Sequence, residues 1–324
     1  MPNPKTPPKK NVLIAGATSV IGRQVAEQLY YDDRNVGHIM AVARESQKPY
    51  YFDEYDTARF SYHSLNILKP RELTNLFLSE RFREARINTV LHLAFMHRSD
   101  APPAESHELN VDGTRALLMK CAETPGIQKF VFLSSWDVYR IKPHNPVLLD
   151  ERSDLNFAQR THGWIKDRVD ADMQCRAMMD HPRLQVVVLR PTGIIGRNVR
   201  LPMSEYLSSR ICPMVAGFNP MVNLIHTFDV MSAIRCAVHR PVKGVFNVVG
   251  QESAPLSEFI RLAGRVRIEL PEPGVRAFNA LQRRLGLTQW DFAVLPERIK
   301  FSCLLDGRKA DEILGYRPTH HVKF

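Results

Sequence analysis

Residues 11–22, NVLIAGATSVIG, constrain the fold of this chain more than any other segment. The segment opens with a continuous apolar run, which is typical of a strand that is buried on both faces of a parallel sheet. A turn bracketed by Gly16 and Gly22 follows, and apolar residues then recur at helical spacing as far as residue 29. The segment therefore predicts a buried strand, a tight turn and an amphipathic helix in direct succession.

Apolar runs and helical patterns continue to alternate along the first 191 residues. Strands that are apolar throughout and are each followed by a helix favour a parallel sheet that is covered on both faces. We therefore predict an α/β fold, with a Rossmann-type doubly wound parallel sheet and a smaller C-terminal substrate lobe. The further strands are expected at residues 37–44, 59–65, 87–95, 129–135 and 184–191, and a long helix is expected at 158–179.

The pattern changes after residue 191, which predicts a second unit. We expect residues 11–191 and 223–250 to form an NAD(P)-binding Rossmann domain, and residues 192–222 and 251–324 to form the substrate-binding lobe. Residues 1–10 are rich in proline and lysine and are predicted to be a disordered basic tail. In such folds ligands bind beyond the carboxyl ends of the strands, so the site is expected in the cleft between the two units.

The composition of the 324 residues argues against several classes of protein. Hydrophobic residues make up 44% and charged residues 24%, as in an ordinary globular protein. The net charge of +10 is spread along the chain without a nucleic-acid-binding motif, so we expect no nucleic-acid partner. The five cysteines lack the spacing of metal ligands, and no metal site is predicted.

No apolar run approaches the roughly 20 residues that span a bilayer. We therefore expect no stable membrane insertion, and we predict a cytoplasmic protein that acts on a small molecule. Residues 275–287 have a basic amphipathic pattern, which leaves open an accessory role at a membrane surface or on a polyanion. A helix that covers the substrate lobe would explain the same pattern.

The turn after the first strand has the features of a phosphate loop. Gly16 and Gly22 occupy the first and third positions of a G-x-x-G-x-x-G spacing, and Ser19 occupies the second. Glycines at such a turn let the backbone approach a pyrophosphate closely, at a helix N-terminus that carries free N–H groups. The residues predicted to contact the cofactor here are Gly16, Thr18, Ser19, Val20, Ile21 and Gly22.

The end of the second strand indicates which dinucleotide is bound. An acidic residue at this place accepts hydrogen bonds from the ribose hydroxyls of NAD, whereas arginine pairs with the 2′-phosphate of NADP. The strand ends in VAR, with Arg44 at this place, and this favours NADP. The neighbouring Glu45 keeps NAD possible.

Seven sequence landmarks occur in a fixed order along most of the chain: VLHLAF, LNVDGTRALLMKCAE, FVFLSSWDVY, VVVLRPTGIIG, HTFDVMSAIRCAV, GVFNVVG and ADEILGYRP. On these motifs the chain resembles the extended short-chain dehydrogenase/reductase family of NAD(P)-dependent epimerases and dehydratases. It resembles in particular a bacterial subgroup described as sugar epimerases, in which the active-site set is incompletely kept. The resemblance implies further cofactor contacts from Leu93, Ala94 and Pro191, and a homodimer.

The resemblance also implies an active site. Family members have a serine or threonine, a tyrosine and a lysine in Y-x-x-x-K spacing, and a supporting asparagine. Ser135, Lys166 and Asn110 fit the serine, lysine and asparagine positions, and Lys166 would also hold the nicotinamide ribose. The tyrosine position, four residues before the lysine, is His162.

The role of His162 stays open between three readings. The ammonium of Lys166 would lower the pKa of His162 from about 6.5, so the ring would be neutral at pH 7. The site then either binds cofactor without catalysis, or uses His162 as a base for alcohol oxidation, or takes its proton from another residue. The candidates for that other residue are Asp137, Tyr139 and His97.

The function predicted from these residues is that of an NAD(P)-binding, epimerase/dehydratase-like oxidoreductase with altered or weak activity. The alternative is a cofactor-binding pseudoenzyme that acts as a sensor or scaffold. Gly193 replaces the asparagine with which sugar-nucleotide epimerases contact the substrate phosphate, and this lowers the expectation of a UDP-sugar substrate.

Overall fold

A computed structural model describes residues 9–95 and 102–324, and within them seven parallel strands form one central sheet in the order β10-β6-β5-β4-β1-β2-β3. This confirms the predicted doubly wound sheet, because the strand order reverses between β1 and β4. The strands are β1 (Lys10–Ala15), β2 (Val36–Ala43), β3 (Phe60–Ser64), β4 (Thr89–His92), β5 (Lys129–Leu133), β6 (Gln185–Pro191) and β10 (Gly244–Val248).

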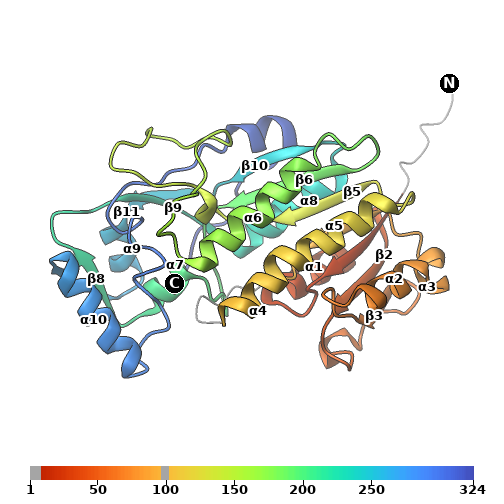
Figure 1. Cartoon of the computed structure of the whole chain (residues 1–324), viewed down its shortest axis with the longest axis horizontal. Helices are drawn as coiled ribbons and strands as arrows, with labels where there is room; N and C mark the ends of the chain where they lie inside the picture. Colours follow the sequence, from red (N-terminus) through yellow and green to blue (C-terminus); the bar gives the residue numbers. More distant parts are fainter. Residues whose placement is uncertain (1–8, 96–101) are drawn as a thin grey trace.

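Helices cover both faces of the sheet because successive strand residues point to opposite sides. Val12 and Ile14 of β1 pack with α1 (Val20–Tyr31) and α8 (Thr227–His239) on one face. Leu13 of β1 packs on the other face, against α5 (Gly113–Glu123) and α6 (Gly163–Ala177) (Figure 1). The same face carries α2 (Pro70–Leu78), α3 (Glu80–Glu84), α4 (Pro103–His107) and the π-helical turn η2 (Glu108–Asp112).

The second unit lies at the carboxyl ends of the strands, on the left of Figure 1. It contains a three-stranded sheet β11-β9-β7 and a two-stranded sheet β12-β8, with a core of its own around Tyr206 and Trp290. Its elements are β7 (Gly193–Ile195), α7 (Pro202–Ser208), β8 (Ile211–Val215), β9 (Met221–His226), β11 (Glu252–Pro255), α9 (Leu256–Leu262), β12 (Val266–Leu270) and α10 (Glu272–Arg284). Elsewhere in the described chain there are three short helical turns: η1 (Tyr50–Phe52), η3 (Trp136–Val138) and η4 (Ala310–Leu314).

Two of the expected boundaries differ from the structure. The strand expected to lead back into the large sheet, β9, lies instead in the three-stranded sheet, where it pairs with β7 and β11. Helix α8 and strand β10 return to the Rossmann domain, and Ala310 and Leu314 near the end of the chain also pack in its core, although they were expected in the lobe. The expected tail also ends earlier, because Lys10 already pairs with Val36 in the large sheet, while residues 1–8 lie outside the described part of the chain.

A buried ion pair fixes helix α6 against the sheet. Arg190 at the end of β6 donates to both carboxylate oxygens of Asp172, at 2.5 and 2.9 Å, and both side chains are fully buried. Ser134 also donates to Asp172, at 2.6 Å. Arg190 further donates to the hydroxyl of Tyr139, which donates in turn to Asn247 on β10. The network links α6 to the ends of three neighbouring strands.

In the described residues no helix combines the length and the apolar character that crossing a bilayer requires.

Candidate active site

The two glycines of the phosphate loop are required by the geometry of the turn. Gly16 has a φ of 85°, and a Cβ atom on it would lie 2.5 Å from the backbone nitrogen of Ala94. A Cβ atom on Gly22 would lie 2.1 Å from the carbonyl oxygen of Gly16. A larger residue at position 16 would therefore push the loop away from the end of β4, and one at position 22 would push helix α1 away from the loop.

Ser19 begins helix α1 and holds the loop closed. Its Oγ accepts from the N–H of Gly22 at 3.0 Å and donates to the carbonyl of Gly16 at 2.8 Å. The helix N-terminus behind the loop supplies free N–H groups and the positive end of the helix dipole, which suits a pyrophosphate.

A hollow of about 250 Å³ opens between this loop and the ends of β2 and β4. It brings together six of the predicted cofactor residues: Gly16, Thr18, Ser19, Arg44, Leu93 and Ala94. Val20 and Ile21 line an adjoining hollow of about 340 Å³, which Ser19 and residues 198–201 also border. Gly22 and Pro191 are buried behind these surfaces and border neither hollow. The cradle fits the adenosine and pyrophosphate of a dinucleotide.

Arg44 and Glu45 both reach this hollow. The Arg44 side chain is half exposed, and its guanidinium lies 3.9 Å from the carboxylate of Glu105. Both oxygens of Glu45 lie 3.1 Å from the hydroxyl of Thr18, which donates to them. A half-exposed arginine and an acid tied to the loop are thus adjacent at this hollow.

At the end of β5, Ser135 belongs to a buried polar cluster. Its hydroxyl donates to the carboxylate of Asp137 at 2.6 Å. The other oxygen of Asp137 lies 3.2 Å from Nε of Arg298, and both of these side chains are almost fully buried. Arg298 donates to the carbonyl of Trp136 and lies 4.4 Å from the centre of its ring. A serine hydroxyl, a carboxylate and a guanidinium therefore form one connected unit.

The structure does not bring Lys166 to this cluster. Lys166 lies on the exposed face of α6, and its ammonium donates to the carbonyl of Gln159 at 2.9 Å. The physical reason is the phase of the helix: with Asp172 held by Arg190, the residues four and eight positions earlier on α6 also face inward. Those two residues are Trp164 and Arg168.

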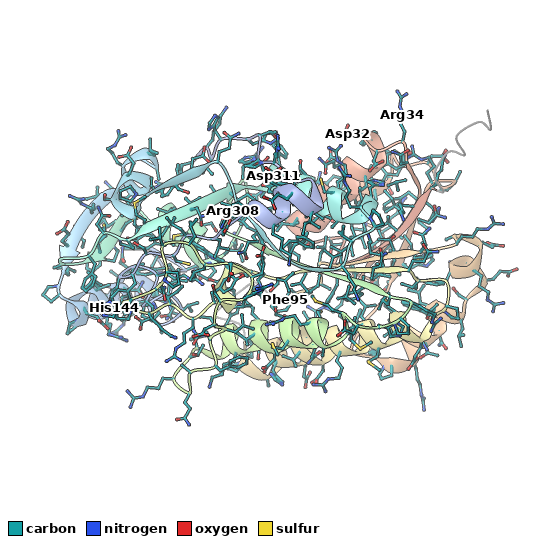
Figure 2. All side chains as sticks on the ribbon, turned by 90° about the horizontal axis from the view of Figure 1, so that it is seen from above. Asp32, Arg34, Phe95, His144, Arg308 and Asp311 are labelled. Atoms are coloured by element: carbon teal, nitrogen blue, oxygen red, sulfur yellow. The ribbon has the colours of Figure 1, made fainter. Side chains whose placement is uncertain are left out.

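Arg168 lines the same small hollow as Ser135, and sequence reasoning missed it. It is buried, and its guanidinium lies 3.9 Å from the ring centre of Trp164 and 4.7 Å from that of Phe95, which lies near the middle of the molecule (Figure 2). Burial lowers the pKa of Arg168 to about 10, against the opposing effect of Asp137. Trp164 and Arg168 are four residues apart, as in the family's Y-x-x-x-K pair. This spacing in the sequence could have identified Arg168 as a candidate site residue.

His162 caps the start of α6 and faces a different hollow. Its Nδ1 accepts from the backbone N–H of Trp164 at 3.2 Å, so in the neutral ring the proton is on Nε2. Burial lowers the pKa of His162, with Asp291 acting in the opposite direction. The hollow it borders has a volume of about 250 Å³ and is also lined by Asp137 and Arg298.

Asn110 lies behind helix α6, away from both hollows. Its side-chain amide donates to Ser106 at 3.1 Å, and Ser106 donates to Asp167 at 3.0 Å. His107 bonds to the other oxygen of Asp167, and this hydrogen bond raises the pKa of His107. Asn110 thus ties η2 to α6, which is a positioning contact.

Of the remaining proton candidates in the described residues, Asp137 lines both hollows. The hydroxyl of Tyr139 is engaged by Arg190 and Asn247, and burial raises the pKa of Tyr139 to about 12. His97 lies outside the described residues.

The hollows form one row along the carboxyl ends of the strands. The two at the phosphate loop share Ser19, the second shares Leu201 with the Ser135 hollow, and that one shares Asp137 with the His162 hollow. The Ser135 hollow has the smallest volume of the four, about 20 Å³, and residues 201–203 are part of its lining.

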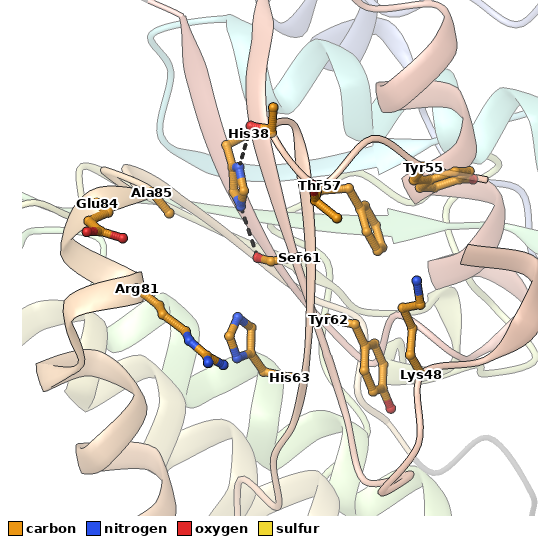
Figure 3. Close-up of a pocket in the computed structure, with 12 residues that line it drawn as sticks. His38, Lys48, Tyr55, Thr57, Ser61, Tyr62, His63, Arg81, Glu84 and Ala85 are labelled. Carbon is orange, nitrogen blue, oxygen red and sulfur yellow. Dashed lines mark hydrogen bonds between the residues drawn. The ribbon is translucent and has the colours of Figure 1, made fainter. Parts of the chain in front are cut away.

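A further hollow, of about 620 Å³, lies at the outer edge of β3 (Figure 3). His38 bonds there to Ser61 at 2.9 Å, and the side chains of His63 and Arg81 extend toward one another. It contains none of the phosphate-loop or Ser135 residues, so it is not part of the row.

Comparison with known proteins agrees with this geometry. The model of the NAD dependent epimerase/dehydratase family matches residues 12–249, and the chain belongs to that family. An uncharacterized protein of Mycobacterium tuberculosis is 31% identical over 258 residues, which are 76% of this chain and 66% of that protein's own length. The chain thus spans slightly less than two thirds of that relative.

Two more distant proteins match over most of their length. An N-acetyl-alpha-D-glucosaminyl-diphospho-ditrans,octacis-undecaprenol 4-epimerase of Escherichia coli O157:H7 is 25% identical, with 90% of this chain and 85% of the epimerase covered. A dTDP-glucose 4,6-dehydratase from Bacillus anthracis, solved in complex with NAD, superposes with a TM-score of 0.69 at 16% identity, covering 96% of this chain and 92% of that one. These findings confirm the family and the Rossmann-type fold.

Proposed function

We propose that this chain is an NAD(P)-binding oxidoreductase with a non-standard active site and slow turnover, and that it prefers NADP. The observation that carries the proposal is the row of hollows from the phosphate loop to Ser135 and His162. Such a row suits a dinucleotide laid across the strand ends with a substrate at its far end.

The residues around Ser135 have separate roles in this proposal. Bound nicotinamide would supply or accept the hydride. Ser135 and Asp137 orient a substrate oxygen, and Arg298 pairs with Asp137 and holds it in place. Arg168 replaces the lysine as the fixed cation beside the cofactor. In the family's tyrosine position stands Trp164, which has no proton to give or accept near neutral pH.

We assign His162 a role in binding, which is narrower than the roles that the sequence leaves open for it. A base needs a free acceptor nitrogen, but Nδ1 of His162 already accepts from Trp164. The neutral ring therefore presents an N–H donor to its hollow. We propose that His162 binds a substrate oxygen and does not abstract a proton, and the lack of a strong proton donor accounts for slow turnover.

The test is titration of the chain with NADPH and NADH by isothermal calorimetry, followed by turnover assays on panels of carbonyls and alcohols. We expect micromolar NADPH binding and little turnover. Failure of both nucleotides to bind would refute the proposal. Rapid turnover that is lost in His162→Ala would show instead that the histidine is a true acid or base.

A second candidate function, that of a cofactor-responsive pseudoenzyme, is favoured by the narrow space beside Ser135. Nicotinamide can enter there only if residues 201–203 move away. A comparison of NADPH with 2′-phospho-ADP-ribose separates the two functions. An oxidoreductase binds NADPH more tightly by about tenfold or more, because the nicotinamide makes contacts of its own. Equal affinities support the pseudoenzyme.

A further inference from the structure

We propose that the hollow beside His162 binds a small organic acid, held by its single carboxylate, as the substrate of this site. The proposal rests on the proposed function, since it names the substrate class for the same row of hollows. It differs from a nucleotide-sugar substrate in charge, size and points of contact.

The charge of the hollow favours a monoanion. Its lining contains three arginines, Arg140, Arg160 and Arg298, against two carboxylates, Asp137 and Glu297, which leaves one positive charge in excess.

Ion pairs already engage both carboxylates. Asp137 is paired with Arg298, and Glu297 lies 3.3 Å from the ammonium of Lys300. In the described part of the chain, neither Arg140 nor Arg160 forms an ion pair. Both side chains are exposed and line the hollow, so their positive charges are available to a bound anion.

Several hydrogen-bond donors line the hollow. His162 contributes Nε2–H, because its Nδ1 is occupied and burial keeps the ring neutral. The N-terminus of the 15-residue helix α6 begins directly after it, and its dipole also favours a negative charge. A carboxylate is the small group that accepts from a ring N–H and two guanidinium groups at once.

The hollow is small and has a mixed lining. Ile141, Ile165 and residues 293–296 are apolar, whereas Asn156 and Thr161 are polar. Its volume of about 250 Å³ lies below the roughly 300–1,000 Å³ typical of pockets for drug-sized ligands. A compact acid with an apolar body fits this space, whereas a nucleotide diphosphate joined to a sugar is too large for it.

The place of the phosphate-contacting asparagine is also filled. A Cβ atom on Gly193 would lie 3.1 Å from the Trp136 ring and 2.7 Å from the Leu224 side chain. The side chains of Leu224 and Trp136 thus take up the room that an amide at position 193 needs. The recognition of a sugar-linked diphosphate at this point is therefore absent.

The experiment measures binding of four probes by calorimetry, each with and without saturating NADP⁺: 3-phenylpropionate, its uncharged amide, phenyl phosphate and UDP-glucose. We expect the acid to bind and the amide to bind at least about tenfold more weakly. Tighter binding of UDP-glucose or of phenyl phosphate would overturn the proposal. So would equal binding of acid and amide, or binding of none of the probes.

The variant Arg140→Gln/Arg160→Gln should weaken binding of the acid by about tenfold or more and leave NADPH binding unchanged. Arg152→Gln, which removes an exposed arginine outside the hollow, serves as the matched control and should change neither. If NADPH does not bind the unmodified protein, the proposed function is refuted. Acid binding can still be measured without NADP⁺ in that case, so the two proposals can fail separately.

Discussion

The guanidinium of Arg168 lies 3.9 Å from the ring centre of Trp164, and both side chains are buried on the inner face of α6 next to Ser135. In our proposal these two residues occupy the positions of the family's tyrosine and lysine. The stacked pair of Trp164 and Arg168 instead provides a positive charge but no side chain that can transfer a proton.

Restoring that pair should create activity. We predict that Trp164→Tyr/Arg168→Lys raises turnover on the panel substrate that binds best by about a hundredfold, the lower end of what acid–base catalysis contributes. The measurement is the steady-state rate of NADPH oxidation.

The matched control is His162→Tyr, which restores a Y-x-x-x-K pair on the exposed side of the helix start. It should not raise the rate, because in our proposal His162 binds the substrate and is not the proton donor. A gain in His162→Tyr with none in the double variant would show that the family positions are His162 and Lys166 after all. Melting curves on both variants check that they are folded.

Arg44 is predicted to select the cofactor. Arg44→Ala should weaken NADPH binding by about tenfold and leave NADH binding nearly unchanged, because only the 2′-phosphate loses its partner. Calorimetry with both nucleotides measures the ratio. An equal loss for both would mean that Arg44 acts on the pyrophosphate or on the loop.

The Asp172–Arg190 pair should be costly to break. Asp172→Asn leaves Arg190 buried without its counter-charge, and we predict a loss of about 3–5 kcal/mol in the free energy of unfolding. Urea denaturation measures the loss. Lys142→Gln breaks the exposed pair with Asp154 and should change stability little. Similar effects of the two variants would contradict the structural role of the buried pair.

His92, at the end of β4, should make the fold sensitive to acid. Burial lowers the pKa of His92 to about 3, whereas in the unfolded chain it is about 6.5. Between these values the unfolded state binds a proton that the folded state does not, so stability falls as the pH falls, by up to about 1.4 kcal/mol per pH unit.

Urea midpoints between pH 7 and pH 4.5 test this effect. His92→Gln keeps a donor for Thr114 and should flatten the slope by about one proton. His144→Gln, at an exposed site, should keep the original slope. An unchanged slope in His92→Gln would assign the acid sensitivity to other groups.

The sheet and the phosphate loop could be predicted because their signals are local. Apolar runs mark strands wherever both faces of a sheet are covered. Gly16 marks the turn, because the backbone conformation there favours glycine. The inner face of α6 could not be predicted in this way. A spacing of four residues is satisfied by His162 with Lys166 and equally by Trp164 with Arg168.

The choice between these pairs depends on contacts that are distant in the sequence. Helix α6 begins at Gly163, five residues later than its sequence pattern suggests. Its rotation about its own axis is set by Arg190, which lies on strand β6. The substrate hollow depends on longer separations still, because Arg298 reaches Asp137 from the C-terminal part of the chain. Local periodicity contains no information about such contacts.

The packing of Leu224 and Trp136 against Gly193 restricts how the specificity of the site can change. Asparagine at position 193 would collide with the Leu224 side chain and with the tryptophan ring, and a smaller residue at position 136 alone would leave a void. Each single step toward a nucleotide-sugar site is therefore penalised. Engineering this chain toward such substrates requires positions 136, 193 and 224 to be exchanged together.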